Sequence, residues 1–181
     1  MKHSLGPLIK ALTPLIRGIC FYQSDVTVKE LEEKGCMVLV VTPHMADVPK
    51  LVGRSGRQSK ALNFLCEQYG RQHGFAGGSR IEESYVGVRA VSSTPPEDPA
   101  FDQTGVLAIV NELMSLLLSR RAEVTTEPKD DRLCVYVHLT PFHTLVDGNI
   151  VNAVEDLMYP YGKANGRKIK VKVPSDETVT P

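Results

Sequence analysis

This chain is poor in several features, and each shortage narrows what the protein can be. Its 181 residues include no tryptophan, and aromatic residues make up only 6%. No apolar run reaches the roughly 18 residues that a bilayer-spanning helix needs, so we predict no membrane segment. The four cysteines lie far apart, without a Cys-x-x-Cys pair. This spacing favours reduced thiols in a cytoplasmic protein, bacterial or in a host cell, over a disulfide framework or a metal site.

The chain also lacks net charge, although its two halves differ in sign. Residues 1–92 hold 12 Lys and Arg against 8 Asp and Glu, a charge of +4, and residues 93–181 hold 9 against 13, a charge of −4. A basic surface over the whole molecule is therefore excluded, but a local one in the first half is not. The sequence shows neither a nucleophile–base motif nor a phosphate loop ending in Gly-Lys-Ser/Thr. We therefore predict a protein that is not an enzyme and needs no cofactor or metal.

The pattern of apolar residues predicts an α+β fold made of two similar halves. The first half is expected to contain, in order, a helix, two strands, a short helix, a second helix and a strand, at residues 5–19, 25–31, 36–42, 47–52, 58–70 and 80–91. The second half repeats the pattern with a helix, two strands, a helix and a strand, at residues 106–118, 123–127, 133–139, 149–159 and 168–173. Proline and acidic residues predict a linker at 93–102 between domains 1–92 and 103–175, and residues 176–181 are a tail.

An internal repeat supports this division. At an offset of 92 residues, glycines, alanines, leucines and tyrosines coincide, as in the pairs Gly56 and Gly148, Ala61 and Ala153, Leu65 and Leu157, Tyr69 and Tyr161, and Gly70 and Gly162. The second copy has a six-residue deletion, and Leu145 stands where the first copy has Gly53. Two related units, repeating at this offset of 92 residues, account for the length of the chain.

The most informative motif is the loop Gly53-Arg54-Ser55-Gly56. Two glycines let the backbone turn tightly and approach a ligand with no side chain in the way. The loop leads into a predicted helix, whose first N–H groups are unpaired and carry the positive end of the helix dipole. The basic residues in and around the loop are Lys50, Arg54, Arg57 and Lys60. Such a corner suits phosphate, so we predict a clamp for a nucleic-acid backbone, with a plain helix–helix turn as the alternative.

The residues around this loop resemble a known family. Val52-Gly53-Arg54-Ser55-Gly56-Arg57-Gln58-Ser59-Lys60-Ala61 is similar to the Ile-Gly-basic-x-Gly-Arg-x-x-Lys-Ala pattern of the small bacterial KH RNA-binding proteins. The order helix–strand–strand–helix–GxxG–helix–strand, over residues 5–91, is that of a type II KH domain. The resemblance implies two tandem type II KH-like units, each a three-stranded sheet packed by helices, with a degenerate second unit. The tandem arrangement is also similar to that of RNA-binding KH proteins of large nucleus-forming phages.

The resemblance also implies a function and a set of site residues. A GxxG loop of this family clamps the backbone of about four single-stranded nucleotides. Gly53, Arg54, Ser55 and Gly56 would be the clamp of a single-stranded RNA-binding protein. The residues expected to flank the nucleic acid are Lys50, Arg57 and Lys60, and those expected to form an apolar floor beneath the bases are Val52, Ala61 and Val40. Single-stranded DNA is an alternative ligand, and a structural adaptor that uses the fold for protein contacts is an alternative function.

The second unit departs from the family pattern at its loop. Val146-Asp147-Gly148 has one glycine, no basic residue and an aspartate that would repel phosphate. We therefore expect this unit to pack on the first, to form a homo-oligomer or to bind a protein partner. The alternating residues Lys168, Lys170 and Lys172 share one face of a strand and form a candidate secondary basic surface. A solvated sheet edge that resists aggregation is the alternative interpretation of these lysines.

Overall fold

The computed structural model describes residues 3–82, 102–118, 122–139 and 145–174 of the chain. The elements of the first half are α1 (Gly6–Ile19), β1 (Thr27–Glu33), β2 (Cys36–Thr42), α2 (Val48–Val52), α3 (Arg57–Gln72) and β3 (Ala76–Ile81). Those of the second half are α4 (Gln103–Leu117), β4 (Ala122–Lys129), β5 (Arg132–Leu139), α5 (Leu145–Ala164) and β6 (Lys168–Lys172). The predicted α+β class is confirmed. None of the described helices is both long enough and apolar enough to cross a bilayer.

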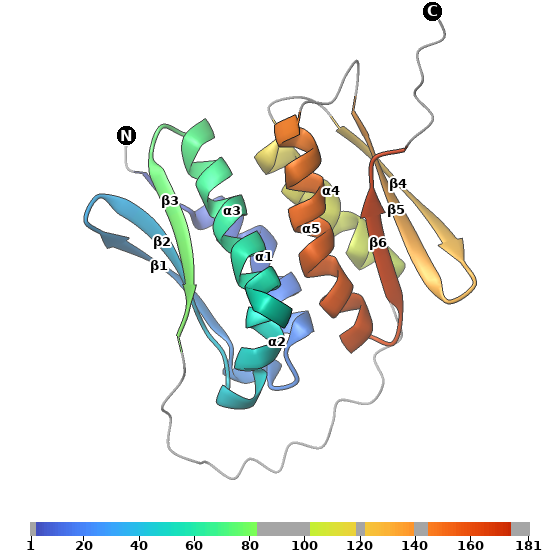
Figure 1. Ribbon diagram of the computed structural model, residues 1–181, viewed down its shortest axis with the longest axis horizontal. Helices are drawn as coiled ribbons and strands as arrows, with labels where there is room; N and C mark the ends of the chain where they lie inside the picture. The colour runs from blue at the N-terminus through green and yellow to red at the C-terminus, as the bar shows by residue number, and fades with distance from the viewer. Residues whose placement is uncertain (1–2, 83–101, 119–121, 140–144, 175–181) are drawn as a thin grey trace, which may run out of the picture.

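Each half contributes one three-stranded sheet with the same topology. The central strand, β2 or β5, pairs antiparallel with the strand before it and parallel with the last strand of its half. Figure 1 shows the two sheets on opposite sides of the molecule, with the long helices between them. The protein is thus layered as sheet, helices, sheet, and each sheet covers one side of a shared helical layer.

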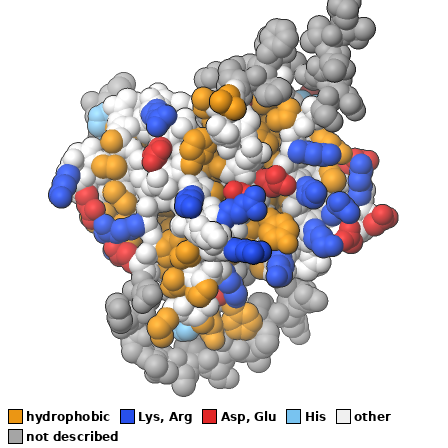
Figure 2. Space-filling model, in the orientation of Figure 1, with side chains coloured by type: hydrophobic (Ala, Val, Ile, Leu, Met, Phe, Trp, Pro, Cys, Tyr) orange, Lys and Arg blue, Asp and Glu red, His pale blue; other side chains and the backbone are white. Residues whose placement is uncertain are grey.

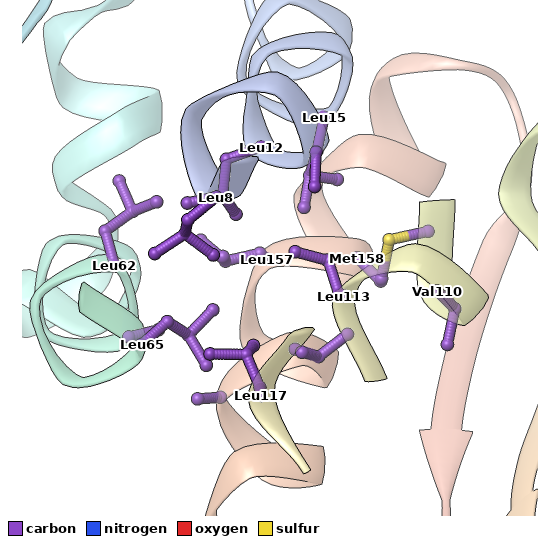
Figure 3. Packing of buried hydrophobic residues seen from close by; sticks show 14 of the residues in the cluster. Leu8, Leu12, Leu15, Leu62, Leu65, Val110, Leu113, Leu117, Leu157 and Met158 are labelled. Carbon is purple, nitrogen blue, oxygen red and sulfur yellow. The ribbon is translucent and has the colours of Figure 1, made fainter. Parts of the chain in front are cut away.

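The helical layer holds one hydrophobic core that belongs to both halves. α3 packs against α5, and α1 packs against both α4 and α5. Figure 3 shows leucines of α1 and α3 meeting side chains of α4 and α5, among them Leu12, Leu65, Leu113 and Leu157. All four are fully buried. The two predicted domains therefore do not have separate cores, because the apolar face of each half is covered by the other.

The two halves agree closely where the long helix turns into the last strand. The N–H groups of Phe75 and Arg167 donate to the carbonyls of Gly70 and Gly162, in both cases at 2.9 Å. A glycine with a φ of 76° in the first half and 74° in the second forms the turn between. These equivalent bonds lie at the predicted offset, and they show that the sequence repeat is also a structural one.

The close approach of helix and strand requires glycine at both repeat positions. A Cβ atom on Gly70 would lie 2.6 Å from the Phe75 carbonyl oxygen, and one on Gly162 would lie 2.4 Å from that of Arg167. We expect Gly70→Ala and Gly162→Ala each to lower the free energy of unfolding by about 1–3 kcal/mol, as overpacking of a tight contact does. Denaturant titration would measure the change.

Gly148 is the matched control for these two variants, because it lies in the first turns of α5 and, beyond its own helix backbone, no described atom lies within 4 Å of an added Cβ. Gly148→Ala should raise the free energy of unfolding by about 0.5–1 kcal/mol, since alanine restricts the unfolded backbone more than glycine. Unchanged stability of Gly70→Ala would contradict the close helix–strand approach.

Two predicted elements are wrong in position. The sequence predicts the last strand of the first half at 80–91, but β3 spans Ala76–Ile81, and residues 83–91 lie outside the described part. Gly77 explains the shift, because a Cβ there would lie 2.2 Å from the Cys66 carbonyl oxygen, so the glycine lets the strand lie against α3. In the second half, α5 begins at Leu145, four residues before the expected start. The predicted tail and almost all of the predicted linker lie outside the described residues.

Candidate nucleic-acid interface

The loop between α2 and α3 has a backbone that few sequences can adopt. α2 ends at Val52, and the next residue, Gly53, has φ 74° and ψ 174°. Residues 54–56 form a single 3₁₀ turn, in which Ser55 has φ 57° and Gly56 has φ 73°. The positive φ values at Gly53 and Gly56 suit glycine, and the extended combination at Gly53 is essentially restricted to it. The turn leaves the side chains of Arg54 and Ser55 exposed at the start of the sixteen-residue α3.

Gly53 is also needed because another side chain occupies the space beside it. A Cβ atom on Gly53 would fall 1.1 Å from Oε1 of Gln58. Gln58 is buried, and its Nε2 donates to the Asp156 carbonyl of α5 at 3.3 Å. The loop is therefore held against a helix of the second half, and its position depends on both halves of the chain.

The four predicted basic residues have different environments. Arg57 pairs with Asp156 of α5 at 2.7 Å, and Lys50 pairs with Asp47 at 2.8 Å. Arg54 and Lys60 are exposed and form no ion pair within the described part of the chain. Arg54 and Lys60 are thus the charges most open to a ligand, while Arg57 also fastens the loop to the second half.

Asp47 fixes the base of the loop. Its side chain is fully buried and accepts hydrogen bonds from the backbone N–H groups of Phe21, at 3.0 Å, and Tyr22, at 2.8 Å, besides the Lys50 ammonium group. Burial alone would raise the pKa of Asp47, but the bonds from Lys50, Tyr22 and Phe21 together hold that pKa below its ordinary value. The charged carboxylate therefore joins the end of α1 to the start of α2.

The predicted apolar floor is only partly accessible. Val52 is half-buried, and Ala61 is buried in the core. Val40 is 0% exposed and alternates along β2 with the core residues Leu39 and Val41. Its side chain therefore points to the face of the sheet away from the helices and the loop. The expectation that Val40 forms part of the floor beneath the bases is therefore wrong, because its side chain is buried on the far face of the sheet.

A pocket of about 570 Å³ opens beside the loop, at the junction of the two halves. Its walls come from the end of α1, from α2 and the loop, and from the last turns of α5. Three basic side chains line it, Lys50, Arg54 and Lys163, and no Asp or Glu is among its described lining residues. Figure 2 shows Lys and Arg side chains gathered over the middle of the face where α3 and α5 lie side by side.

Two aromatic residues of this pocket are unusually exposed. Phe21 is 42% exposed and Tyr159 is 54% exposed, and both line the pocket. Nothing in the sequence singles them out, because they lie in different halves and far from the glycine motif. The pocket also contains Cys20, and burial raises the pKa of this thiol to about 12, so it adds no negative charge.

The lysines of the candidate secondary surface lie on one face of β6, as alternation predicts. Lys168, Lys170 and Lys172 are exposed, while Ile169 and Val171 between them are buried. Lys168 pairs with Asp131 at 2.5 Å, and the Lys172 ammonium lies 5.0 Å from the ring centre of Tyr136. Asp131 thus partly neutralises the charge of this surface at Lys168, and Lys172 lies against an aromatic ring.

The second half has no loop at the position expected for its degenerate motif. Val146, Asp147 and Gly148 lie in the first turn of α5, and Asp147 is buried. The expectation of a loop at residues 146–148 before a helix at 149–159 is therefore wrong, because the continuous helix α5 begins at Leu145. Its apolar residues Ile150, Val154 and Leu157 face the shared core, and this packing favours one long helix.

Comparison with known proteins adds no assignment. A scan against protein-family models gives no match, and a search of curated proteins finds no similar sequence. Among the described residues, no cluster of three or more His, Cys, Asp or Glu side chains could hold a metal ion.

Proposed function

We propose that this protein binds single-stranded RNA through a backbone clamp at Gly53–Gly56. In this proposal each half is a KH-like unit of type II, and only the first carries a GxxG loop between its helices. The loop would hold sugar-phosphate groups with its N–H groups and with Arg54, while Lys60 and Lys50 flank the strand. The second unit would support the loop from the side of α5.

The observation that carries the proposal is the combination of the loop geometry with exposed basic side chains that have no acidic partner in the described part of the chain. The loop turns through Gly53, Ser55 and Gly56 with positive φ at all three residues, directly before a long helix. The N-terminal N–H groups of such a helix favour an anion. Arg54 and Lys60 stand beside it without acidic partners in the described part of the chain. A helix–helix turn alone would not require unpaired cations at this point.

Salt dependence of binding tests the proposal. For single strands, the logarithm of affinity falls with the logarithm of salt concentration by about 0.7 for each phosphate neutralised. A clamp on a few phosphates should therefore give a slope of about −2 to −3. Fluorescence anisotropy with labelled RNA and DNA oligomers of matched sequence, over a series of salt concentrations, would measure it.

Preference for RNA over the matched DNA in this experiment would support RNA as the ligand, because the two differ at the 2′-hydroxyl. Equal or stronger binding of DNA would favour single-stranded DNA. The absence of binding to either oligomer at low salt would overturn the proposal and leave the structural adaptor as the remaining candidate.

A further inference from the structure

The pocket beside the clamp is built by both halves of the chain. Asn165, which directly follows α5, donates through Nδ2 to the Gly18 carbonyl of α1 at 3.2 Å. Gly18 leaves room for the Tyr161 ring, because a Cβ on Gly18 would lie 2.2 Å from that ring. These contacts fix the last turns of α5 against the end of α1, so the two walls of the pocket are held at a set separation.

The charge of the pocket suits a polyanion. Arg54 stands on the wall of the first half beside Lys50, which is paired with Asp47, and Lys163 stands on the wall of the second half. A second pocket, of about 700 Å³, shares Gly18, Gln23 and Asn165 with the first and adds Lys10 and Arg17. Basic side chains therefore continue from the glycine loop along the junction of α1 and α5, and none of the described residues lining either pocket is acidic.

The aromatic side chains give the same pocket a second property of single-strand binding sites. Phe21 and Tyr159 are large apolar side chains that remain exposed, and they stand in different halves on the walls of one basic pocket. The Lys50 ammonium lies 5.6 Å from the centre of the Phe21 ring. Aromatic rings interleaved with cations bind single strands, because every base has a face that can stack and every nucleotide carries a phosphate.

We propose that bases of the strand held by Gly53–Gly56 enter the pocket between the two halves and stack on Phe21 and Tyr159. The second half then forms part of the nucleic-acid site through α5, with Lys163 contacting a phosphate beyond the clamp. This inference rests on the proposed function. It assigns a binding role to a unit that has no clamp of its own, and it directs the strand away from Val40 and the sheet.

The absence of tryptophan offers a direct test, because one introduced indole reports only on its own site. Stacking of a base on an indole ring quenches its fluorescence. Phe21→Trp and Tyr159→Trp each keep an aromatic ring in the pocket, and Leu145→Trp is the control. Leu145 lies at the other end of α5 and is 82% exposed. Titration with an unlabelled 12-nucleotide RNA should quench the indoles at 21 and 159 and leave the one at 145 unchanged.

Affinity measurements on the same oligomer separate a stacking contact from simple proximity. Phe21→Ala and Tyr159→Ala should each weaken binding about tenfold, and the two tryptophan variants should bind about as well as the wild type. Lys163→Glu should weaken binding about tenfold, whereas Lys168→Glu, an equal change of charge on β6 of the same half, should have little effect. Circular dichroism would confirm that each variant is folded.

The outcomes distinguish the two proposals. If the wild type binds RNA but the indoles at 21 and 159 are not quenched, and Lys163→Glu binds normally, then the shared pocket is overturned and the clamp stands. If Lys168→Glu weakens binding and Lys163→Glu does not, the strand runs over β6 and the pocket is again overturned. If the wild type does not bind at low salt, both proposals fail.

Discussion

RNA affinity is expected to fall at least 100-fold when Arg54 and Ser55 are both replaced by aspartate. The variant removes the unpaired cation of the loop and places two carboxylates where phosphate would bind. Like charges in direct opposition cost several kcal/mol, which corresponds to a loss of two or more orders of magnitude. Anisotropy titration of the wild type and the variant at the same low salt concentration would measure the loss.

The folded structure should tolerate this double substitution. Arg54 and Ser55 are exposed, and surface changes of this kind usually alter stability by no more than about 0.5 kcal/mol. Ser55 has φ 57°, a left-handed conformation that aspartate accepts more readily than most residues. A loss of binding would therefore report on the site and not on unfolding, which a thermal melt of the same sample would verify.

Arg54→Gln with Ser55→Asn is the matched control, because it changes the same positions without adding negative charge. It should show an intermediate loss of affinity and a smaller salt slope than the wild type, since one cation is gone. Full affinity in the aspartate variant would contradict the clamp and would move the site elsewhere, first to the surface of Lys168, Lys170 and Lys172.

Asp47→Ala is expected to destabilise the protein by about 2–5 kcal/mol at neutral pH. The change leaves the N–H groups of Phe21 and Tyr22 without their hydrogen-bond acceptor, and it removes the partner of Lys50. An unsatisfied buried donor costs about 1–3 kcal/mol, and bonds to a charged group are stronger than neutral ones. Denaturant unfolding would measure the difference, with exposed Asp25→Ala as a control that should change stability by no more than about 0.5 kcal/mol.

The contribution of Asp47 to stability should also depend on pH. Folding lowers the pKa of this carboxyl group from its ordinary value of 3.8. The unfolded chain therefore takes up a proton before the folded one does, and the stabilisation is complete above the unfolded pKa. It is lost as pH falls through the folded pKa. The gap in stability between the wild type and Asp47→Ala should shrink below about pH 4, and a constant gap down to pH 2 would contradict this role.

Asp47→Ala should also weaken RNA binding, although Asp47 is not among the residues that line the pocket. Asp47 positions the backbone of Phe21 and holds Lys50 at the rim. If Asp47→Ala lost stability without any loss of affinity under folded conditions, the position of Phe21 would not matter for binding, and the stacking proposal would be weakened.

The sequence predicts the loop and the order of elements well, because both depend on local chemistry. Gly53 and Gly56 predict a turn between two amphipathic segments, and both residues have positive φ in the structure. The alternation of Lys168 and Lys170 with buried Ile169 likewise follows from the two-residue period of a strand. Features of this kind need only a few neighbouring residues to be read correctly.

The pocket could not be predicted from the sequence, because distant residues form it. Phe21 and Tyr159 are separated by most of the chain, and each on its own would be taken as an ordinary core side chain. The start of α5 was missed for a similar reason. The likeness of Val146-Asp147-Gly148 to the loop of the first half predicts a loop, whereas packing of α5 on α1 and α3 favours a continuous helix there. Tertiary contacts decided both features.

The pairing of charges was also hidden from the sequence. Arg57 is predicted to flank the nucleic acid, and it also forms an ion pair with Asp156 of the other half. Lys50 likewise has Asp47 as its partner, within the same short segment. Counting basic residues near a motif therefore overestimates the charge that a ligand can use, because the count does not show which carboxylates fold against them.

The common core makes the two halves one cooperative unit. Cutting the chain between residues 82 and 102 would expose to water the faces of α1 and α3 that α4 and α5 now cover, among them Leu12 and Leu65. A fragment of the first half alone would therefore tend to aggregate, even with every residue of its loop intact. The second half thus keeps the first half soluble by covering its apolar faces. Substitutions in the α5 face that contacts the core should abolish RNA binding by removing soluble protein, and those at its exposed first residues should be tolerated.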